Sequence, residues 1–180
     1  MTTAVLKVLS THAAMDVLGV LGPKFEQAHG CRLSYRYDPA KAVKRAIEEG
    51  AAVDIAIVTR AVFDDLVSQG KLLASPRGDV GRSGLGLSVR QDAAKPDIST
   101  AESFRHMLLA ASSVARSVEG TSGIYFDQLI DRLGIRKEMR DKIVLAPSGR
   151  VAELVARGEA EIAVQQVPEL LPVAGAQYVG

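Results

Sequence analysis

The sequence contains one cysteine, Cys31, and no tryptophan among its 180 residues. A single cysteine excludes an internal disulfide and any zinc cluster built from cysteines. Aromatic residues make up 4%, which disfavours a groove that stacks sugars or nucleic-acid bases. Lysine and arginine number 22 against 21 for aspartate and glutamate, so the net charge of +1 gives no strong field for nucleic acid or an anionic membrane. We therefore expect a small-molecule partner, no nucleic acid, no metal and no cofactor.

Long apolar runs are also missing. No segment approaches the roughly 18 apolar residues that a membrane-spanning helix needs. Residues 1–10 lack the basic start, apolar centre and small-residue cleavage site of a secretory leader. As it stands, the sequence predicts a soluble, cytoplasmic protein; if a leader has been removed, it predicts a periplasmic one. Hydrophobic residues still make up 47%, enough for a core in one domain or in two small lobes.

Short apolar runs alternate with helical periodicity along the chain, which is typical of an α/β protein. Glycine, proline and arginine interrupt this pattern at residues 75–84, so we expect that segment to connect two sets of elements. The run at residues 53–58 is nearly all apolar, as in a parallel strand that is buried on both faces. The predicted strands are residues 5–9, 32–37, 53–58, 85–89, 113–116, 142–145 and 162–165, with helices between them.

The helices have recognisable ends and faces. Asp38 is predicted to cap the second helix, with Pro39 at its first position. Ser99 and Glu102 predict a capping box at a later helix. The charged residues 136–138 are interpreted as a solvated helix face or cap. The first helix is predicted to bury one apolar face, made by Met15, Leu18, Leu21 and Phe25.

Small polar residues follow several predicted strands and precede helices. In α/β sheets, ligands bind beyond the carboxyl ends of the strands, where helix N-termini present unpaired N–H groups and partial positive charge. Hydroxyls there donate hydrogen bonds, and lysine or arginine adds charge for a carboxylate or phosphate. An alternative is that each serine or threonine only caps its own helix. The candidate anion-binding residues are Ser10, Thr11, His12, Lys41, Thr59, Arg60, Thr121, Ser122, Ser148 and Arg150.

Several segments resemble those of one known family. They read LKVLSTHAAMDVL, EEGAAVDIAIVT, VEGTSGIYFDQLIDRLGI and GRVAELVARGEAEIAVQQVPELL. In this order, over nearly the whole chain, they resemble the type II periplasmic substrate-binding proteins, and within them the molybdate-binding-like branch. The resemblance implies an α/β fold of two lobes, each a mixed sheet flanked by helices, that close on a small anion held in the cleft between them. It places the first lobe at residues 1–82, the second at 83–174, and a return to the first lobe from 175–180.

Departures from this branch change what the resemblance implies. Molybdate proteins typically offer serine hydroxyls from their first two loops, whereas the second loop here contains Ala40 and Lys41, and Gln166 stands at a family tyrosine. Because a lysine suits an organic carboxylate, we expect a carboxylate rather than molybdate, with Gln166 among the ligand-binding residues. Relatives also continue beyond residue 180, so the first lobe is expected to lack its returning elements. Such a chain is either a fragment or one that forms a homodimer, in which a second copy covers the exposed apolar surface and strand edge.

Three functions are compatible with these residues. The leading hypothesis is a solute-binding protein without enzymatic activity, the receptor of an ABC-type uptake system that delivers its anion to a membrane permease. The alternative is an isomerase of a small unsaturated tricarboxylate such as aconitate, a reaction known among proteins that resemble this branch. His12 would then be the base, with Lys41, Arg60 and Arg150 as carboxylate anchors; otherwise His12 is a loop residue that bonds the backbone. The third hypothesis is an effector-sensing domain like those of transcriptional regulators of this fold.

Overall fold

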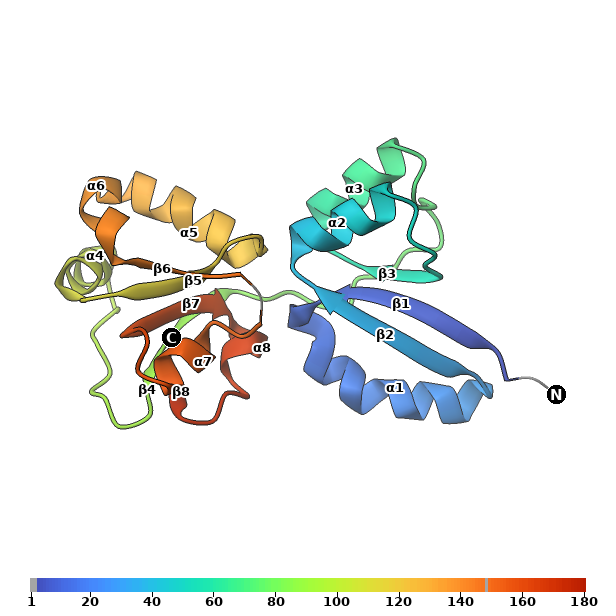
Figure 1. Ribbon diagram of the computed structural model, residues 1–180, viewed down its shortest axis with the longest axis horizontal. Coiled ribbons are helices and arrows are strands. Elements are labelled where there is room, and N and C mark those ends of the chain that lie inside the picture. The colour runs from blue at the N-terminus through green and yellow to red at the C-terminus, as the bar shows by residue number, and fades with distance from the viewer. Residues whose placement is uncertain (1–2, 148) are drawn as a thin grey trace. The chain divides into compact units, whose positions relative to one another are not determined.

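A computed structural model describes residues 3–147 and 149–180 (Figure 1). The chain divides into two compact units, Met1–Arg82 and Ser83–Gly180. Each unit has its own sheet flanked by helices, so the α/β fold class predicted from the sequence is confirmed. Within the described residues, no helix has the length and apolar character needed to cross a membrane.

The first unit is built on three parallel strands in the order β2-β1-β3. Its α1 helix covers one face of the sheet, and α2 and α3 cover the other (Figure 1). The core lies under α2 and α3, where Leu9, Val43, Ile47 and Leu66 are buried. The elements are β1 (Val5–Thr11), the 3-10 helix η1 (His12–Ala14), α1 (Met15–His29), β2 (Arg32–Asp38), α2 (Ala40–Glu48), β3 (Ile55–Ile57) and α3 (Arg60–Ser68).

The buried stripe of α1 differs from the predicted one. Leu21 and Phe25 are 51% and 42% exposed, so the predicted face is wrong at these positions. Gly22 lies so close to β2 that an added Cβ would be 2.3 Å from the Tyr35 hydroxyl oxygen. The Glu26 carboxylate accepts a hydrogen bond of 2.6 Å from a backbone N–H of β2. A glycine and a glutamate therefore occupy the packed stripe, and the buried or half-buried residues of α1 are Met15, Leu18, Gly22 and Glu26.

The strand predicted at residues 53–58 also needs correction. It is shorter, because β3 spans only Ile55–Ile57, and Ile55 is 38% exposed. The reason is its place in the sheet: β3 is an edge strand that pairs with β1 alone, so it is not covered as a central strand would be.

The start of α2 is set by the sheet rather than by the predicted cap. Asp38 remains in β2, where it lies opposite Thr11 in the register, and its carboxylate accepts a hydrogen bond of 2.6 Å from the Arg36 Nε. Pro39 is the N-cap residue of α2 and makes no side-chain cap. The prediction that Asp38 caps this helix is therefore wrong.

The second unit is built on a mixed sheet of five strands in the order β6-β5-β7-β4-β8. β5 is parallel to β6 and β7, whereas β4 is antiparallel to β7 and β8. Helices cover both faces, with α4 and α5 on one side and α7 and α8 on the other (Figure 1). Each face has its own core, around Leu108 and Phe126 under α4 and α5, and around Val155 and Leu170 under α7 and α8.

The two-sided cover explains why β6 and the first three residues of β7 are apolar on both faces. The elements are β4 (Leu85–Arg90), α4 (Ala101–Ala110), β5 (Val114–Ser117), α5 (Thr121–Arg132), α6 (Arg136–Met139), the 3-10 helix η2 (Arg140–Lys142), β6 (Ile143–Ala146), α7 (Ala152–Ala156), β7 (Ile162–Gln166), α8 (Val167–Leu170) and β8 (Ala176–Tyr178).

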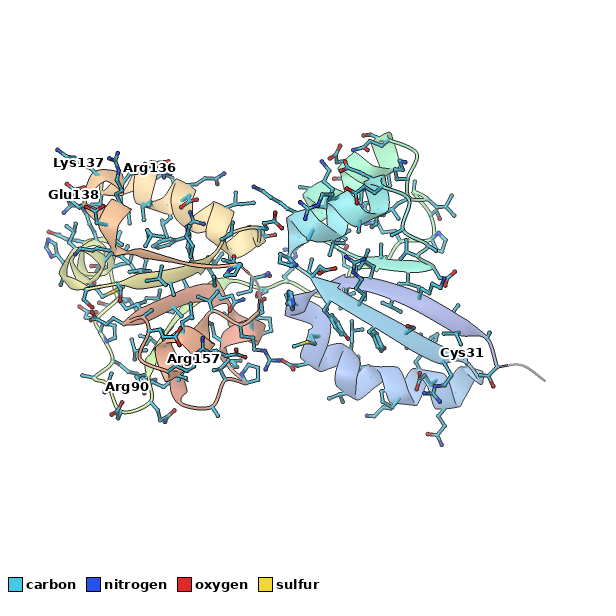
Figure 2. The ribbon with its side chains drawn as sticks, in the orientation of Figure 1. Cys31, Arg90, Arg136, Lys137, Glu138 and Arg157 are labelled. Atoms are coloured by element: carbon cyan, nitrogen blue, oxygen red, sulfur yellow. The ribbon has the colours of Figure 1, made fainter. Side chains whose placement is uncertain are left out.

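Four of these elements, α6, η2, α8 and β8, were not predicted from the sequence. The exposed side chains of Arg136, Lys137 and Glu138 come from α6 (Figure 2), and Arg136 forms an ion pair with Asp131 of α5. The capping box of α4 lies one residue later than predicted: it joins Thr100 and Ser103. The shift arises because the Ser99 N–H donates instead to the Asp97 carboxylate, at 2.9 Å.

Candidate functional site

Six of the predicted site residues lie at one edge of the first unit. Thr11 lies opposite Asp38, and Ser10 opposite Ile57, so β1, β2 and β3 end together. The helices η1, α2 and α3 begin directly after these strand ends. This edge gathers Ser10, Thr11, His12, Lys41, Thr59 and Arg60.

Two of the six have structural roles within the unit. Ser10 is fully buried, and its Oγ donates a hydrogen bond of 2.9 Å to the carbonyl oxygen of Thr11. Thr59 is the N-cap of α3, and its Oγ1 accepts a hydrogen bond of 3.5 Å from the Val62 N–H. Both hydroxyls therefore stabilise the backbone at this edge of the sheet.

The other four reach the surface to different degrees. Thr11 and His12 are half-buried at the end of β1, whereas Lys41 and Arg60 are exposed in the first turns of α2 and α3. Because the N-cap of α2 is Pro39, no cap side chain satisfies the N–H groups of its first turn. Lys41 therefore adds an ammonium group to a helix terminus that already carries partial positive charge.

Four predicted residues lie at the corresponding edge of the second unit. β5 and β6 end in register, and β7 ends beside them. Gln166 is the last residue of β7, Thr121 and Ser122 begin α5, and Arg150 lies shortly before α7. Ser148, which was also predicted as a site residue, lies outside the described residues.

The start of α5 packs directly on the end of β5. A Cβ added to Gly123 would lie 1.9 Å from the carbonyl oxygen of Ser117, and one added to Gly120 would lie 2.4 Å from its Oγ. Gly120 is the N-cap of α5 and makes no side-chain cap, while the buried Ser122 hydroxyl lies 3.3 Å from that of Ser117. Ser117 was missed in the sequence analysis; its signal is a serine that ends an apolar strand just before a glycine-containing loop.

A buried polar network lies on the face of the second sheet that α7 and α8 cover. Gln165, only 2% exposed, accepts a hydrogen bond of 2.7 Å from the Val151 N–H and donates one of 2.9 Å to Glu169. Burial raises the pKa of Glu169 to about 7, although hydrogen bonds from Gln165 and Gln166 and the charge of Arg150 lower it. The network ties the end of β7 to the start of α7. Sequence reasoning missed it; the signal is two glutamines at the end of an apolar strand.

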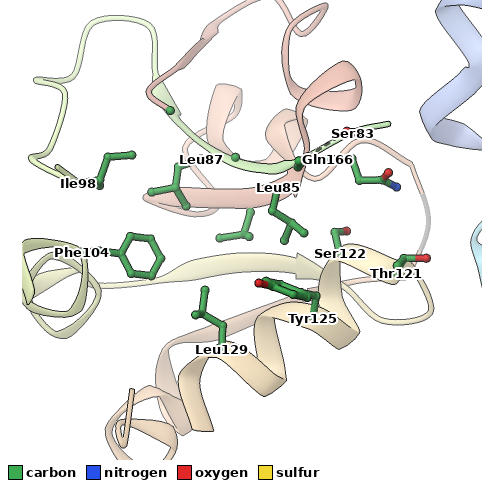
Figure 3. Close-up of a pocket in the computed structure, with 14 residues that line it drawn as sticks. Ser83, Leu85, Leu87, Ile98, Phe104, Thr121, Ser122, Tyr125, Leu129 and Gln166 are labelled. Carbon is green, nitrogen blue, oxygen red and sulfur yellow. Dashed lines mark hydrogen bonds between the residues drawn. The ribbon is translucent and has the colours of Figure 1, made fainter. Parts of the chain in front are cut away.

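The second unit also contains a pocket of about 590 Å³ on the sheet face that α4 and α5 cover (Figure 3). Because side chains alternate along a strand, Gln166 lines this pocket while Gln165 points to the opposite face. Most of the lining is apolar and comes from Leu85, Leu87, Ile98, Phe104, Leu129 and Val164. Four polar side chains gather at one end, as Figure 3 shows: Ser83, Thr121, Ser122 and Gln166. The Tyr125 hydroxyl instead points along the pocket toward Leu129.

The edges of both units present hydrogen-bond donors and positive charge at the carboxyl ends of their strands. Hydroxyls, an amide and uncapped helix N-termini all stabilise an anion. Among residues 3–147 and 149–180, no group of three or more His, Cys, Asp or Glu side chains is placed to hold a metal ion.

Comparison with known proteins shows which family and which relatives this chain resembles. The family model for bacterial extracellular solute-binding proteins matches residues 6–180. An aconitate isomerase from a Pseudomonas species is 33% identical over 181 residues, which covers 97% of this chain and 69% of that protein.

Two solved structures share the fold. The periplasmic molybdate-binding protein of Azotobacter vinelandii has a TM-score of 0.75 at 20% identity, over 94% of this chain and 74% of that one. The tungstate ABC transporter structure from Geobacter sulfurreducens has a TM-score of 0.76 at 19% identity, over 97% of this chain and 78% of that one. These similarities confirm the predicted type II periplasmic-binding-protein fold.

Proposed function

The chain belongs to the bacterial extracellular solute-binding protein family, and on that basis we propose that it captures a small organic carboxylate. The observation that carries the choice of ligand is Lys41, an exposed lysine in the first turn of α2, next to the uncapped helix N-terminus at Pro39. An ammonium group beside a helix N-terminus suits a carboxylate, which accepts charge-assisted hydrogen bonds. In this proposal the bound carboxylate is passed to the permease of an ABC-type uptake system.

Isothermal titration calorimetry with a panel of anions tests this function. The panel contains di- and tricarboxylates, molybdate, tungstate, sulfate and phosphate. We expect carboxylates to bind, and a bound ligand at 100 times its Kd to raise the free energy of unfolding by about 2.7 kcal/mol. Heat of binding with molybdate alone would contradict the carboxylate preference.

A lysine pair gives the matched variants for this panel. Lys41→Met removes the charge and keeps most of the side-chain length, so carboxylate binding should weaken by about ten- to a hundredfold, the usual effect of losing a hydrogen bond to a charged group. Lys24→Met changes an exposed lysine on α1, away from the edge that holds Lys41, and should bind like the unaltered protein. Equal weakening in both variants would count against a specific role for Lys41.

A second function, isomerisation of an unsaturated tricarboxylate such as aconitate, is supported by the 33% identity to an aconitate isomerase. The reaction moves one proton from one substrate carbon to another while the double bond shifts, so no atom is gained or lost. His12, half-buried at the end of β1, is our candidate for the base, with Lys41, Arg60 and Arg150 as carboxylate anchors.

Proton NMR in D₂O tests the isomerase directly. The unaltered protein should interconvert cis- and trans-aconitate and introduce deuterium, and His12→Gln should abolish this while aconitate still binds. If the unaltered protein gives no interconversion above a blank, the isomerase function is wrong for this substrate, whereas carboxylate capture remains open to the calorimetric test.

A further inference from the structure

We propose that the pocket of the second unit binds the apolar part of an organic carboxylate, whose carboxylate group lies at the end formed by Thr121 and Ser122. This inference rests on the proposed function and narrows its ligand class to carboxylates that carry an alkyl chain or an aromatic ring.

The size of the pocket argues for a ligand. Protein interiors are close-packed, and voids larger than a water molecule are few. A volume of about 590 Å³ lies well within the range of roughly 300 to 1,000 Å³ that is typical of small-molecule sites. The pocket is partly open to solvent, and its volume is that of a ligand site rather than that of an internal void.

The apolar side chains of the lining favour a ligand with an apolar part. An ordered buried water needs about two to four polar partners. Away from the Thr121 end the lining side chains are apolar, among them Leu87, Phe104 and Leu129, except for the Tyr125 hydroxyl, which points toward Leu129 (Figure 3). That hydroxyl already accepts a hydrogen bond of 3.1 Å from Arg132, so this end holds too few polar side-chain groups for an ordered water. A hydrocarbon chain or an aromatic ring gains free energy there because it leaves water.

The opposite end has the chemistry of an anion site. α5 has 12 residues, and its N-cap Gly120 provides no side-chain cap. Thr121 and Ser122 stand in its first turn, and the Gln166 amide comes from the neighbouring strand β7. These groups donate hydrogen bonds at a helix terminus that favours negative charge. One pocket thus joins an anion-binding end to an apolar end, which matches an amphiphilic carboxylate.

The same geometry separates ligand classes. Molybdate, tungstate and sulfate have no apolar part, so they would leave the inner end unfilled. Aconitate carries three carboxylates, and one placed beside Phe104 and Leu129 would meet a single polar side-chain group of the lining, the Tyr125 hydroxyl, which does not replace the hydration that the charge loses. The proposal therefore favours carboxylates with a single charged end.

A homologous series measures the apolar contribution. Binding of acetate, butyrate, hexanoate and octanoate is followed by calorimetry on the full chain, with hexanol as the uncharged analogue of hexanoate. We expect affinity to rise by about fourfold for each added CH₂ group, the usual gain from burying a methylene. Hexanol should bind much more weakly than hexanoate, because it lacks the charge.

Two glutamine variants, one on α5 and one at its C-cap residue, test which side chains provide this gain in affinity. Leu129→Gln places an amide in the apolar end and should remove most of the gain from butyrate to octanoate, while acetate binds as before. Leu133→Gln makes the same change at the C-cap residue of α5, at a half-buried position that does not line the pocket, and should keep the full gain. Thermal unfolding of both variants checks that they are folded to the same extent.

Each outcome decides the proposal. A rising series that Leu129→Gln flattens supports it. A flat series in a protein that still binds di- or tricarboxylates overturns the pocket assignment and leaves the proposed function intact. Binding of no carboxylate at all removes both. A flat series together with a dimer in light scattering would assign the pocket to a second copy, and hexanol that binds as tightly as hexanoate would refute the anion-binding end.

Discussion

Replacement of Glu169 by glutamine should remove a pH-dependent loss of stability. Glu169 lies on α8 with 6% exposure, and its carboxylate accepts a hydrogen bond of 2.9 Å from Gln165. Burial raises the pKa of this group from 4.5 to about 7, even though Gln165, Gln166 and Arg150 favour the charged form. Glutamine has nearly the same shape and keeps an oxygen that accepts from Gln165, but it stays neutral at every pH.

The sign and size of the effect follow from proton linkage. Below pH 4.5 the carboxyl is protonated in both the folded and the unfolded chain, so it does not make the free energy of unfolding depend on pH. Between pH 4.5 and about 7 the unfolded chain loses this proton while the folded chain keeps it, and the free energy of unfolding falls by about 1.4 kcal/mol per pH unit. The loss is complete above pH 7 and totals about 3 kcal/mol.

Urea unfolding of both proteins from pH 5 to pH 9 measures this difference. Glu169→Gln should gain about 2 to 3 kcal/mol over the unaltered protein between pH 5 and pH 8. Contributions from all other ionisable groups are common to both proteins and cancel in the difference. Glu138→Gln, at an exposed position of α6, is the control and should follow the unaltered protein. If the gap between Glu169→Gln and the unaltered protein is the same at pH 5 and pH 8, Glu169 is not held protonated by burial and the reasoning is wrong.

Two further predictions concern stability and use the same urea assay. Gly123→Ala puts a Cβ 1.9 Å from the Ser117 carbonyl oxygen and should destabilise the protein by about 1 to 3 kcal/mol, whereas Gly19→Ala in α1 meets no atom within 4 Å and should stabilise it by about 0.5 to 1 kcal/mol. Equal effects at both glycines would contradict the close contact of α5 with β5. Thr100→Ala removes the acceptor for the Ser103 N–H in the capping box of α4 and should cost about 1 kcal/mol; no loss would mean that α4 does not depend on this cap.

Part of the site was predictable because it depends on local order. A polar residue that follows a strand and opens a helix must lie at the carboxyl edge of a parallel sheet, and this places Thr11 and Lys41 in one unit and Thr121 and Ser122 in the other. Gln165 and Glu169 could not be found in this way. Their buried network exists only because the fold brings Gln165 between the backbone N–H of Val151 and the carboxylate of Glu169, and Val151 lies 14 residues away from Gln165 in the sequence.

The sequence by itself determined the alternation of strands and helices, the break at residues 75–84 and the family, because hydrophobic periodicity and turn residues act over a few neighbouring positions. Tertiary structure decided which side of each element is buried. Leu21 and Phe25 have the spacing of a core face, yet the contact with β2 falls on Gly22, where only a glycine lets the helix approach Tyr35. The edge position of β3 and the open pocket beside α5 were decided in the same way. Periodicity fixes the type of an element, but burial depends on partners that the chain meets only after it has folded.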